Sequence, residues 1–235
     1  MTPIELSIFF PAYNEAKNLP ELIERTDLFI QQYAKNTEVI VVNDGSSDNS
    51  KEVLKQLEAK YGFLKSVHHP QNQGYGAALR SGFSNSQGKL VFFMDSDNQF
   101  HFDELKEFIK VLEDEKMDGV IGIRTDRKDN FLRKTNTFLW CSLVRLLLGI
   151  RFKDIDCAYK LFKKELIKDI KLETTGAMIS TELLFQVQKR TEKIVERHVN
   201  HYPRTQGSPT GANPLVILRA FKELFSFYFQ NVFKS

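Results

Sequence analysis

The chain has 235 residues, of which 42% are hydrophobic and 27% are charged, and its formal net charge is +3. These values are ordinary for a soluble globular protein, and the small net charge argues against nucleic acid as a partner. The only cysteines, Cys141 and Cys157, form no C-x-x-C pair, so the sequence predicts neither a disulfide framework nor a zinc site.

Hydrophobic runs and the N-terminus indicate where the protein resides. Residues 1–5 have neither the basic nor the apolar part of a signal peptide. No apolar run approaches the roughly 18 residues that a bilayer crossing needs. We therefore expect a cytoplasmic protein that is either free in solution or bound to a membrane surface without crossing it.

Strand-like and helix-like segments alternate along the first 123 residues. Short apolar runs predict buried strands at 6–10, 38–42, 64–68, 90–93 and 119–123. Helical spacing of apolar residues predicts helices between them, including 19–33 and 103–115, and the glycines at 74 and 76 predict a tight turn before another helix. This alternation predicts an α/β fold with a doubly wound, mostly parallel sheet whose ligand site lies at the carboxyl ends of the strands.

Acidic and polar residues follow three of the predicted strands. They are Tyr13 and Glu15 after the first, Asp44 after the second, and Asp95, Asp97 and Gln99 after the fourth. Parallel strands bring these residues to one edge of the sheet, where a row of acids is unfavourable without a cation or a hydrogen-bonding ligand. Hard oxygen ligands suit Mg²⁺ or Mn²⁺, so we predict a nucleotide and metal site. The alternative is a solvated turn that caps the helix beginning near Asp103.

Two later segments are apolar over a broad helical face. The segment 131–152 contains Trp140 and many leucines among basic residues, which is typical of a helix lying at an anionic lipid surface. Its alternative is an ordinary core helix. The segment 214–233 repeats the pattern and fits either a membrane surface or a homodimer interface. Between them, a helix is expected at 180–189 and a strand at 193–199.

Several motifs together resemble family 2 glycosyltransferases of the GT-A fold. They are Pro-Ala-Tyr-Asn-Glu at 11–15, Val-Asn-Asp-Gly-Ser-Ser-Asp at 42–48, Asn-Gln-Gly-Tyr-Gly-Ala-Ala at 72–78 and Asp-Ser-Asp-Asn-Gln at 95–99. The downstream motifs are similar to the dolichol-phosphate mannose synthase and polyprenyl-phosphate glycosyltransferase branch. They are Gly-Ile-Arg at 122–124, Arg133 with Thr137, Asp-Cys-Ala-Tyr-Lys-Leu-Phe at 156–162 and His-Tyr-Pro-Arg-Thr-Gln-Gly at 201–207.

The resemblance implies a Rossmann-like GT-A domain over residues 1–235. Residues 1–123 would form the nucleotide-sugar and metal half, 124–212 the acceptor half and 213–235 a C-terminal amphipathic helix. The implied activity is metal-dependent, inverting transfer of a hexose from a UDP- or GDP-sugar to polyprenyl or dolichyl phosphate. It would take place peripherally on the cytoplasmic face of a membrane, with Mg²⁺ or Mn²⁺ as cofactor.

The resemblance also assigns roles to individual residues. Those implied for the nucleotide are Pro11, Ala12, Tyr13, Glu15, Val42, Asp44, Asp95 and Ser96. Asp95, Asp97 and Gln99 would hold the metal, and Arg124, Arg133, Thr137 and Arg204 would face the acceptor phosphate. Asp97 and Asp156 are the implied catalytic residues.

The chain departs from this branch at two places. It has Arg-Thr-Gln-Gly-Ser-Pro-Thr at 204–210 where the branch often has a further lysine, so one expected phosphate-binding cation is missing. It also has Asn43 in place of the first acid of an Asp-Asp pair. Two other functions stay open: transfer to a hydroxyl acceptor, for which Asp156 would be the base, and a non-catalytic subunit that binds nucleotide-sugars.

Overall fold

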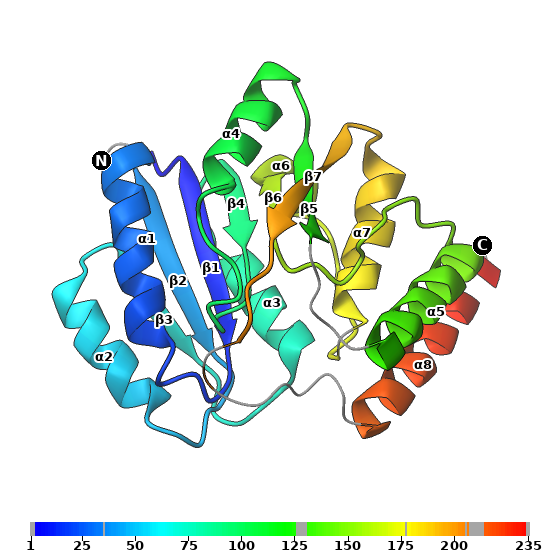
Figure 1. Cartoon of the computed structure of the whole chain (residues 1–235), viewed down its shortest axis with the longest axis horizontal. Helices are drawn as coiled ribbons and strands as arrows, with labels where there is room; N and C mark the ends of the chain where they lie inside the picture. The colour runs from blue at the N-terminus through cyan, green and yellow to red at the C-terminus, as the bar shows by residue number, and fades with distance from the viewer. Residues whose placement is uncertain are drawn as a thin grey trace.

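A seven-stranded sheet with the order β3-β2-β1-β4-β6-β5-β7 forms the centre of the molecule (Figure 1). The computed structural model describes residues 3–34, 36–125, 131–176, 178–204, 206 and 214–233. At 131–139, 214–217, 219 and 232–233 it describes the backbone without the side chains. The strands are β1 (Leu6–Ala12), β2 (Thr37–Asn43), β3 (Leu64–His68), β4 (Leu90–Phe93), β5 (Gly119–Thr125), β6 (Lys160–Lys163) and β7 (Ile194–Asn200).

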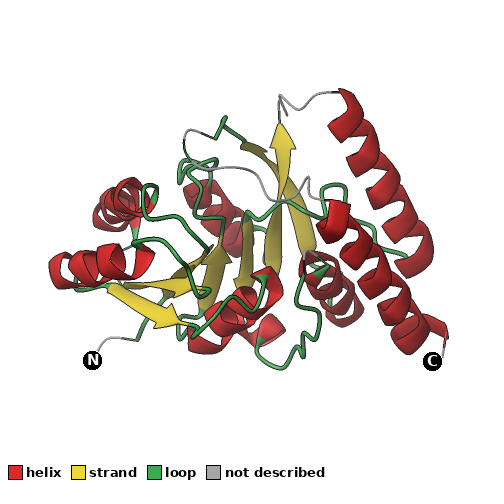
Figure 2. Cartoon of the chain, turned by 90° about the horizontal axis from the view of Figure 1, so that it is seen from below, coloured by secondary structure: helices red, strands yellow, loops and turns green. Residues whose placement is uncertain are grey.

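Helices cover both faces of this sheet, as Figure 2 shows. They are α1 (Leu19–Tyr33), α2 (Ser50–Lys60), α3 (Tyr75–Asn85), α4 (Leu105–Asp114), α5 (Phe131–Leu148), α6 (Lys164–Ile167), α7 (Ile179–Arg190) and α8 (Pro214–Tyr228). A short π-helical segment, Phe229–Phe233, continues α8. The helix predicted at 19–33 and the strands predicted at 64–68 and 90–93 have the bounds that the sequence indicated.

All strands except β6 run in the same direction. β1 pairs in parallel with β2 and β4, β2 with β3, and β5 with β7, whereas β6 is antiparallel to both β4 and β5. The predicted fold, a doubly wound and mostly parallel α/β sheet, is confirmed. Because β4, β5 and β7 point the same way, the segments that follow them emerge at the same edge as those that follow β1 and β2.

Alternate residues of the central strands enter two separate cores. Ile8 and Phe10 of β1 pack in the cluster formed with α1, α2 and α4, while Phe9 between them packs in the cluster formed with α3, α5, α7 and α8. All three side chains are fully buried. A strand covered on both faces is apolar at most positions, and the polar residue of β1, Ser7, is buried with its hydroxyl donating to Glu38 at 2.7 Å.

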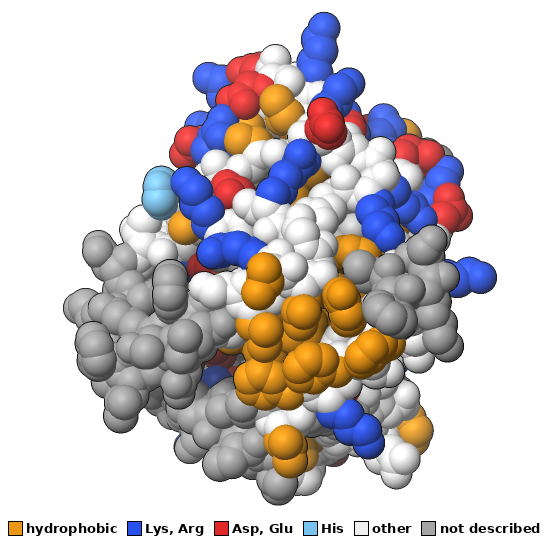
Figure 3. Space-filling view, turned by 90° about the vertical axis from the view of Figure 1, so that its right-hand side faces the viewer, with side chains coloured by type: hydrophobic (Ala, Val, Ile, Leu, Met, Phe, Trp, Pro, Cys, Tyr) orange, Lys and Arg blue, Asp and Glu red, His pale blue; other side chains and the backbone are white. Residues whose placement is uncertain are grey.

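The helices α5 and α8 have one face in the core and another exposed. Val144 and Leu224 are completely buried, whereas Leu146 is 82% and Leu218 is 67% exposed. On the side of the molecule formed by these helices, Figure 3 shows hydrophobic side chains gathered into a patch. No helix within the described ranges combines the length and hydrophobicity that a bilayer crossing requires. The predicted membrane and homodimer contacts both remain predictions.

Two basic residues near α5 serve the fold. Arg145 Nε donates to the carbonyl oxygen of Phe152 at 3.1 Å, and Arg151 Nη2 donates to that of Glu192 at 3.0 Å. The helix also ends at Leu148 instead of continuing to residue 152. The guanidinium groups of Arg145 and Arg151 therefore hold the connection after the helix, and whether they also face a lipid surface stays a prediction.

Candidate active site

The residues that follow β1, β2 and β4 lie side by side. Ala12 is paired with Asn43 across the β1–β2 ladder, so Tyr13 and Asp44 leave the sheet at the same level. Ser96 donates from Oγ to the carbonyl oxygen of Pro11 at 2.8 Å, which joins the segment after β4 to the end of β1. The structure thus brings the predicted nucleotide and metal residues to one edge of the sheet.

Asp95 and Asp97 form a pair of acids at the end of β4. The Tyr75 hydroxyl donates to Asp95 Oδ1 at 3.0 Å, and the backbone amide of Gln99 donates to Asp97 Oδ1 at 3.1 Å. Burial and the nearby charge of Asp95 raise the pKa of Asp97 to about 7, and burial also raises the pKa of Asp95. Such a pair gains from a positive partner.

The carboxylate oxygens of Asp95 and Asp97 and the raised pKa values of both residues fit a divalent cation. Among the described residues, no group of three or more His, Cys, Asp or Glu side chains could hold a metal ion. Two carboxylates are nevertheless enough for Mg²⁺ or Mn²⁺, because such ions take their remaining ligands from water and substrate phosphates. Asp95 and Asp97 therefore match a metal that binds together with a nucleotide diphosphate, while Gln99 donates from Nε2 to the Tyr202 carbonyl oxygen at 2.9 Å.

Arg204 from the segment after β7 reaches this acid pair. Its Nη2 lies 2.5 Å from Glu15 Oε1 and its Nη1 lies 3.5 Å from Asp97 Oδ2. Glu15 also accepts a short hydrogen bond from the Asn18 side chain. A guanidinium predicted to face the acceptor phosphate thus lies against residues predicted to bind the nucleotide and the metal.

Reciprocal contacts hold the backbone that leads to Arg204. The Tyr202 amide donates to the Gln99 carbonyl oxygen at 2.8 Å, so Gln99 and Tyr202 are bonded in both directions. The Tyr202 ring stacks on His101 with 3.9 Å between ring centroids, and the His201 ring packs edge-on against Phe100. The sequence contained no signal for the His101–Tyr202 stack, because the two residues come from distant segments.

Asp44 and Val42 do not present free groups to a ligand. Asp44 Oδ1 lies 2.6 Å from His69 Nδ1 and accepts from the Gln73 amide, and Oδ2 accepts from the Gly74 amide at 2.8 Å. The carboxylate therefore anchors the glycine turn before α3, and Gly74 has the positive φ that the turn prediction required. The Val42 side chain is buried in the core, whereas Tyr13 is 43% exposed.

Arg124 forms a two-point ion pair at the end of β5. Its Nε and Nη2 donate to the two carboxylate oxygens of Asp154 at 2.8 and 2.6 Å, and its amide donates to Asp154 at 3.1 Å. Although burial opposes the charge, the bonds with Asp154 raise the pKa of Arg124, so the guanidinium is permanently positive. Arg133 and Thr137 lie in α5, and their side chains are outside the described part of the structure.

Asp156 lies between β5 and β6 in a segment that a buried lysine contacts. Lys160 Nζ donates to the carbonyl oxygens of Ile155 at 3.2 Å and of Cys157 at a shorter distance. Burial lowers the pKa of Lys160, while the negative groups around it, including Asp154 and Asp156, act in the opposite direction. Lys160 and Tyr75 both lie within motifs that carry the family resemblance, but no role was predicted for either residue.

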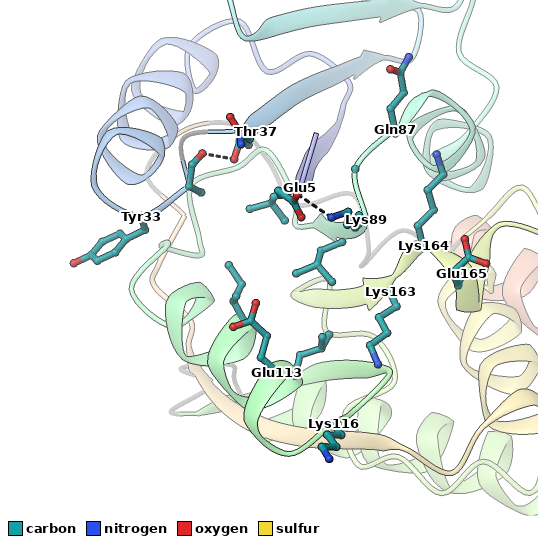
Figure 4. Close-up of a pocket in the computed structure, with 17 residues that line it drawn as sticks. Glu5, Tyr33, Thr37, Gln87, Lys89, Glu113, Lys116, Lys163, Lys164 and Glu165 are labelled. Carbon is teal, nitrogen blue, oxygen red and sulfur yellow. Dashed lines mark hydrogen bonds and ion pairs between the residues drawn. The ribbon is translucent and has the colours of Figure 1, made fainter. Parts of the chain in front are cut away.

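A hollow of about 960 Å³ lies at the other edge of the sheet, away from these residues (Figure 4). It is lined by residues at the starts of β1, β2 and β4 and by α4. Two of its lysines are in ion pairs, Lys89 with Glu5 at 2.9 Å and Lys163 with Asp118 at 3.0 Å, and Lys164 donates to the Ser86 carbonyl oxygen at 2.7 Å. None of the predicted site residues lines it, so it offers no alternative location for them.

Comparison with known proteins identifies relatives of the chain. The model of the family Glycosyl transferase family 2 matches residues 7–171. Dodecaprenyl-phosphate galacturonate synthase of Rhizobium johnstonii is 31% identical over 173 residues, which are 72% of this chain and 51% of that protein. The chain therefore spans about half the length of this curated relative.

Solved structures with the same fold come from glucosyl-3-phosphoglycerate synthase of Mycobacterium tuberculosis. The complex with Mn²⁺, UDP-glucose and phosphoglyceric acid has a TM-score of 0.75 at 18% identity, over 95% of this chain and 79% of that chain. The complex with Mg²⁺ and UDP has a TM-score of 0.74 at 18% identity, over 94% and 78%. At this identity the likeness shows a shared fold.

Proposed function

Because the chain belongs to glycosyl transferase family 2, we propose that it is an inverting, metal-dependent glycosyltransferase that moves a hexose from a UDP- or GDP-sugar to a polyprenyl phosphate. The observation that carries the donor half of this proposal is the Asp95–Asp97 pair. Two acids whose pKa values are both raised stand where parallel strands of this fold end. Solved structures of the same fold contain Mn²⁺ or Mg²⁺ together with UDP.

A divalent cation held by Asp95 and Asp97 would neutralise the charge of the departing nucleotide diphosphate. The remaining work belongs to the protein's own groups. The Tyr75 hydroxyl donates to Asp95, and the backbone amide of Gln99 donates to Asp97. Exposed Tyr13 is available for a nucleotide base near these acids, as its predicted role requires.

Two cations support a phosphate as the acceptor group. Arg124 lies near the end of β5 and Arg204 lies in the segment after β7, and both strands end at the same sheet edge as β4. A phosphate monoester has a second pKa of about 6 and is mostly dianionic at neutral pH, so it is a nucleophile without a strong general base. The enzyme then needs to orient the phosphate behind the anomeric carbon, in a single displacement that inverts that carbon. Asp156 would orient acceptor or sugar in this scheme.

The lipid part of the acceptor is supported by the curated relative, whose name states a dodecaprenyl-phosphate substrate. Exposed apolar side chains of α5, of α8 and of the π-helical segment after it supply a surface for the lipid, and they include Leu146, Leu218, Phe225 and Phe229. We accordingly propose peripheral binding to the cytoplasmic face of a membrane.

A transfer assay tests the proposal directly. The protein is mixed with Mn²⁺ or Mg²⁺, a polyprenyl phosphate in liposomes and one radiolabelled donor at a time, from a panel that includes UDP-glucose, UDP-galacturonic acid and GDP-mannose. Label extracted into organic solvent is the expected result. Asp114→Ala, which changes an exposed acid of α4, should transfer as the wild type does.

The assay has a second informative outcome. If donor is hydrolysed but no label enters the lipid phase, the phosphate acceptor is wrong and a hydroxyl acceptor becomes the better proposal. Asp156 would then be required as a general base, and activity would decrease at low pH, where that base is protonated. If nucleotide-sugar binds tightly and is never turned over, the chain is a binding subunit.

A further inference from the structure

Lys160 is a charged residue placed in the interior of the sheet. It begins β6, pairs with Phe93 of β4 and Ile121 of β5, and its side chain is completely buried. Burying an ammonium group is expensive unless hydrogen bonds compensate for the lost water. A residue that only filled this space between two strands would be apolar, so the lysine needs another explanation.

The hydrogen bonds of Lys160 supply that explanation. Its Nζ donates to the carbonyl oxygens of Ile155 and Cys157, which are the two neighbours of Asp156 in the chain. The ammonium group also lies 5.7 Å from the centroid of the Phe93 ring, on β4 just before the Asp95–Asp97 pair. The side chain therefore holds the backbone on both sides of Asp156 through hydrogen bonds.

A second contact fixes the start of the same segment. Asp154 is held by the backbone amide and the guanidinium of Arg124, and its carbonyl oxygen accepts from the Cys157 amide at 3.3 Å. The segment 154–157 is thus attached to β5 through Arg124 and to β6 through Lys160. Asp156 is the residue that these attachments enclose.

We propose that Lys160 is a positioning residue that holds Asp156 in the orientation needed for sugar transfer. The proposal rests on the proposed function, in which Asp156 orients the acceptor or the sugar. Lys160 itself does not touch substrate. Its contribution is to satisfy the carbonyl groups on both sides of Asp156, so that the carboxylate is presented by a rigid backbone.

Lys160→Met is the informative variant, and Lys163→Met is its matched control. Methionine has a similar length and no donor, and Lys163 lies on the same strand but pairs with Asp118 away from the site. Hydrogen–deuterium exchange of the full chain should show at least tenfold faster exchange in residues 154–158 of Lys160→Met, with the other strands of the sheet unchanged. Lys163→Met should exchange as the wild type does in this segment.

Kinetics of the same variants test whether the hydrogen bonds of Lys160 affect catalysis through Asp156. Lys160→Met should lower kcat at least tenfold while leaving the dissociation constant for the nucleotide unchanged. In a double-mutant cycle, Lys160→Met should cost nothing further once Asp156→Asn is present. If the double variant instead lost kcat by the product of the two single losses, the two residues would act independently and the proposal would be overturned.

Two other outcomes also contradict it. Unchanged exchange in residues 154–158 would show that Lys160 does not hold the segment, and faster exchange throughout β4, β5 and β6 would show that it serves the sheet as a whole. The exchange measurement needs no substrate. If the wild type transfers no sugar, the proposed function fails, while the exchange comparison still decides whether Lys160 holds this segment.

Discussion

Arg204 and Glu15 are 189 positions apart in the chain, yet Nη2 of one lies 2.5 Å from Oε1 of the other. The pair joins the segment after β7 to the segment after β1. Since Arg204 also approaches Asp97, a single guanidinium neutralises acids that belong to both the predicted nucleotide site and the predicted metal site.

Replacing Arg204 by alanine should therefore affect metal and acceptor in opposite directions. In Arg204→Ala, Asp97 no longer has a guanidinium that competes with the metal. In the absence of nucleotide, Mn²⁺ should therefore bind to this variant more tightly than to the wild type, by roughly three- to tenfold for a partly exposed ion pair. Turnover should fall because the acceptor phosphate loses a cation. Mn²⁺ titration followed by electron paramagnetic resonance measures the first effect, with Arg25→Ala as a control on the surface of α1. Weaker Mn²⁺ binding in Arg204→Ala would contradict this relationship.

The raised pKa of Asp97 predicts how stability depends on pH without metal. Its ordinary pKa is 3.8 and its pKa in the folded protein is about 7. Between these values the folded protein holds a proton that the unfolded chain releases, so the free energy of unfolding should decrease as pH rises from about 4 to 7.

Urea unfolding in EDTA at several pH values between 4 and 7 measures this slope. Asp97→Asn should flatten it, because the substitution removes the titrating group and its repulsion with Asp95. Adding Mn²⁺ to the wild type should raise stability most above pH 7, where both acids are ionised. An identical slope in Asp97→Asn would assign the pH dependence to other groups.

Asp95→Ala tests the donor half of the site. We expect it to abolish detectable transfer because the cation loses one of its two carboxylates, while nucleotide binding measured without metal should persist. Tyr75→Phe removes only the hydrogen bond to Asp95 and leaves the carboxylate in place, so it should lower transfer less than Asp95→Ala does. An Asp95→Ala enzyme with near wild-type turnover is incompatible with the proposed mechanism.

Gly74→Ala should destabilise the protein by about 1–3 kcal/mol, the usual cost of a strained backbone conformation. Gly74 has a φ of +97°, and a Cβ atom there would lie 2.5 Å from the Thr175 carbonyl oxygen. Gly62→Ala is the control, because a Cβ atom at Gly62 meets nothing within 4 Å and should change stability by less than about 0.5 kcal/mol. Thermal unfolding of both variants gives the comparison, and equal stabilities would refute the role assigned to the turn.

Local pattern was sufficient for the elements around the donor site. β1 and β2 each contain an apolar run of four or more residues, β4 is apolar throughout, and polar residues follow each run. Both the existence of these strands and the edge at which Glu15, Asp44 and Asp95 emerge could therefore be predicted. Parallel connection rules supplied the rest. These are properties of neighbouring residues in the chain.

Contacts between distant segments could not be predicted in the same way. β6 has only four residues, and its first is a lysine, which a hydropathy pattern assigns to the surface although it is completely buried. The approach of Arg204 to Glu15 depends on where β7 ends relative to β1. The exposed and buried sides of α5 could not be separated either, because leucine occupies both.

The position of β6 between β4 and β5 affects how the chain folds while it is being synthesised. Leu90 of β4 pairs on this side with Lys163, so β4 keeps an open edge until a much later part of the chain leaves the ribosome. An unpaired strand of four apolar residues is prone to associate with other chains. A fragment ending after β5 should consequently aggregate more readily than the full chain, because the edge of β4 that β6 covers would be open.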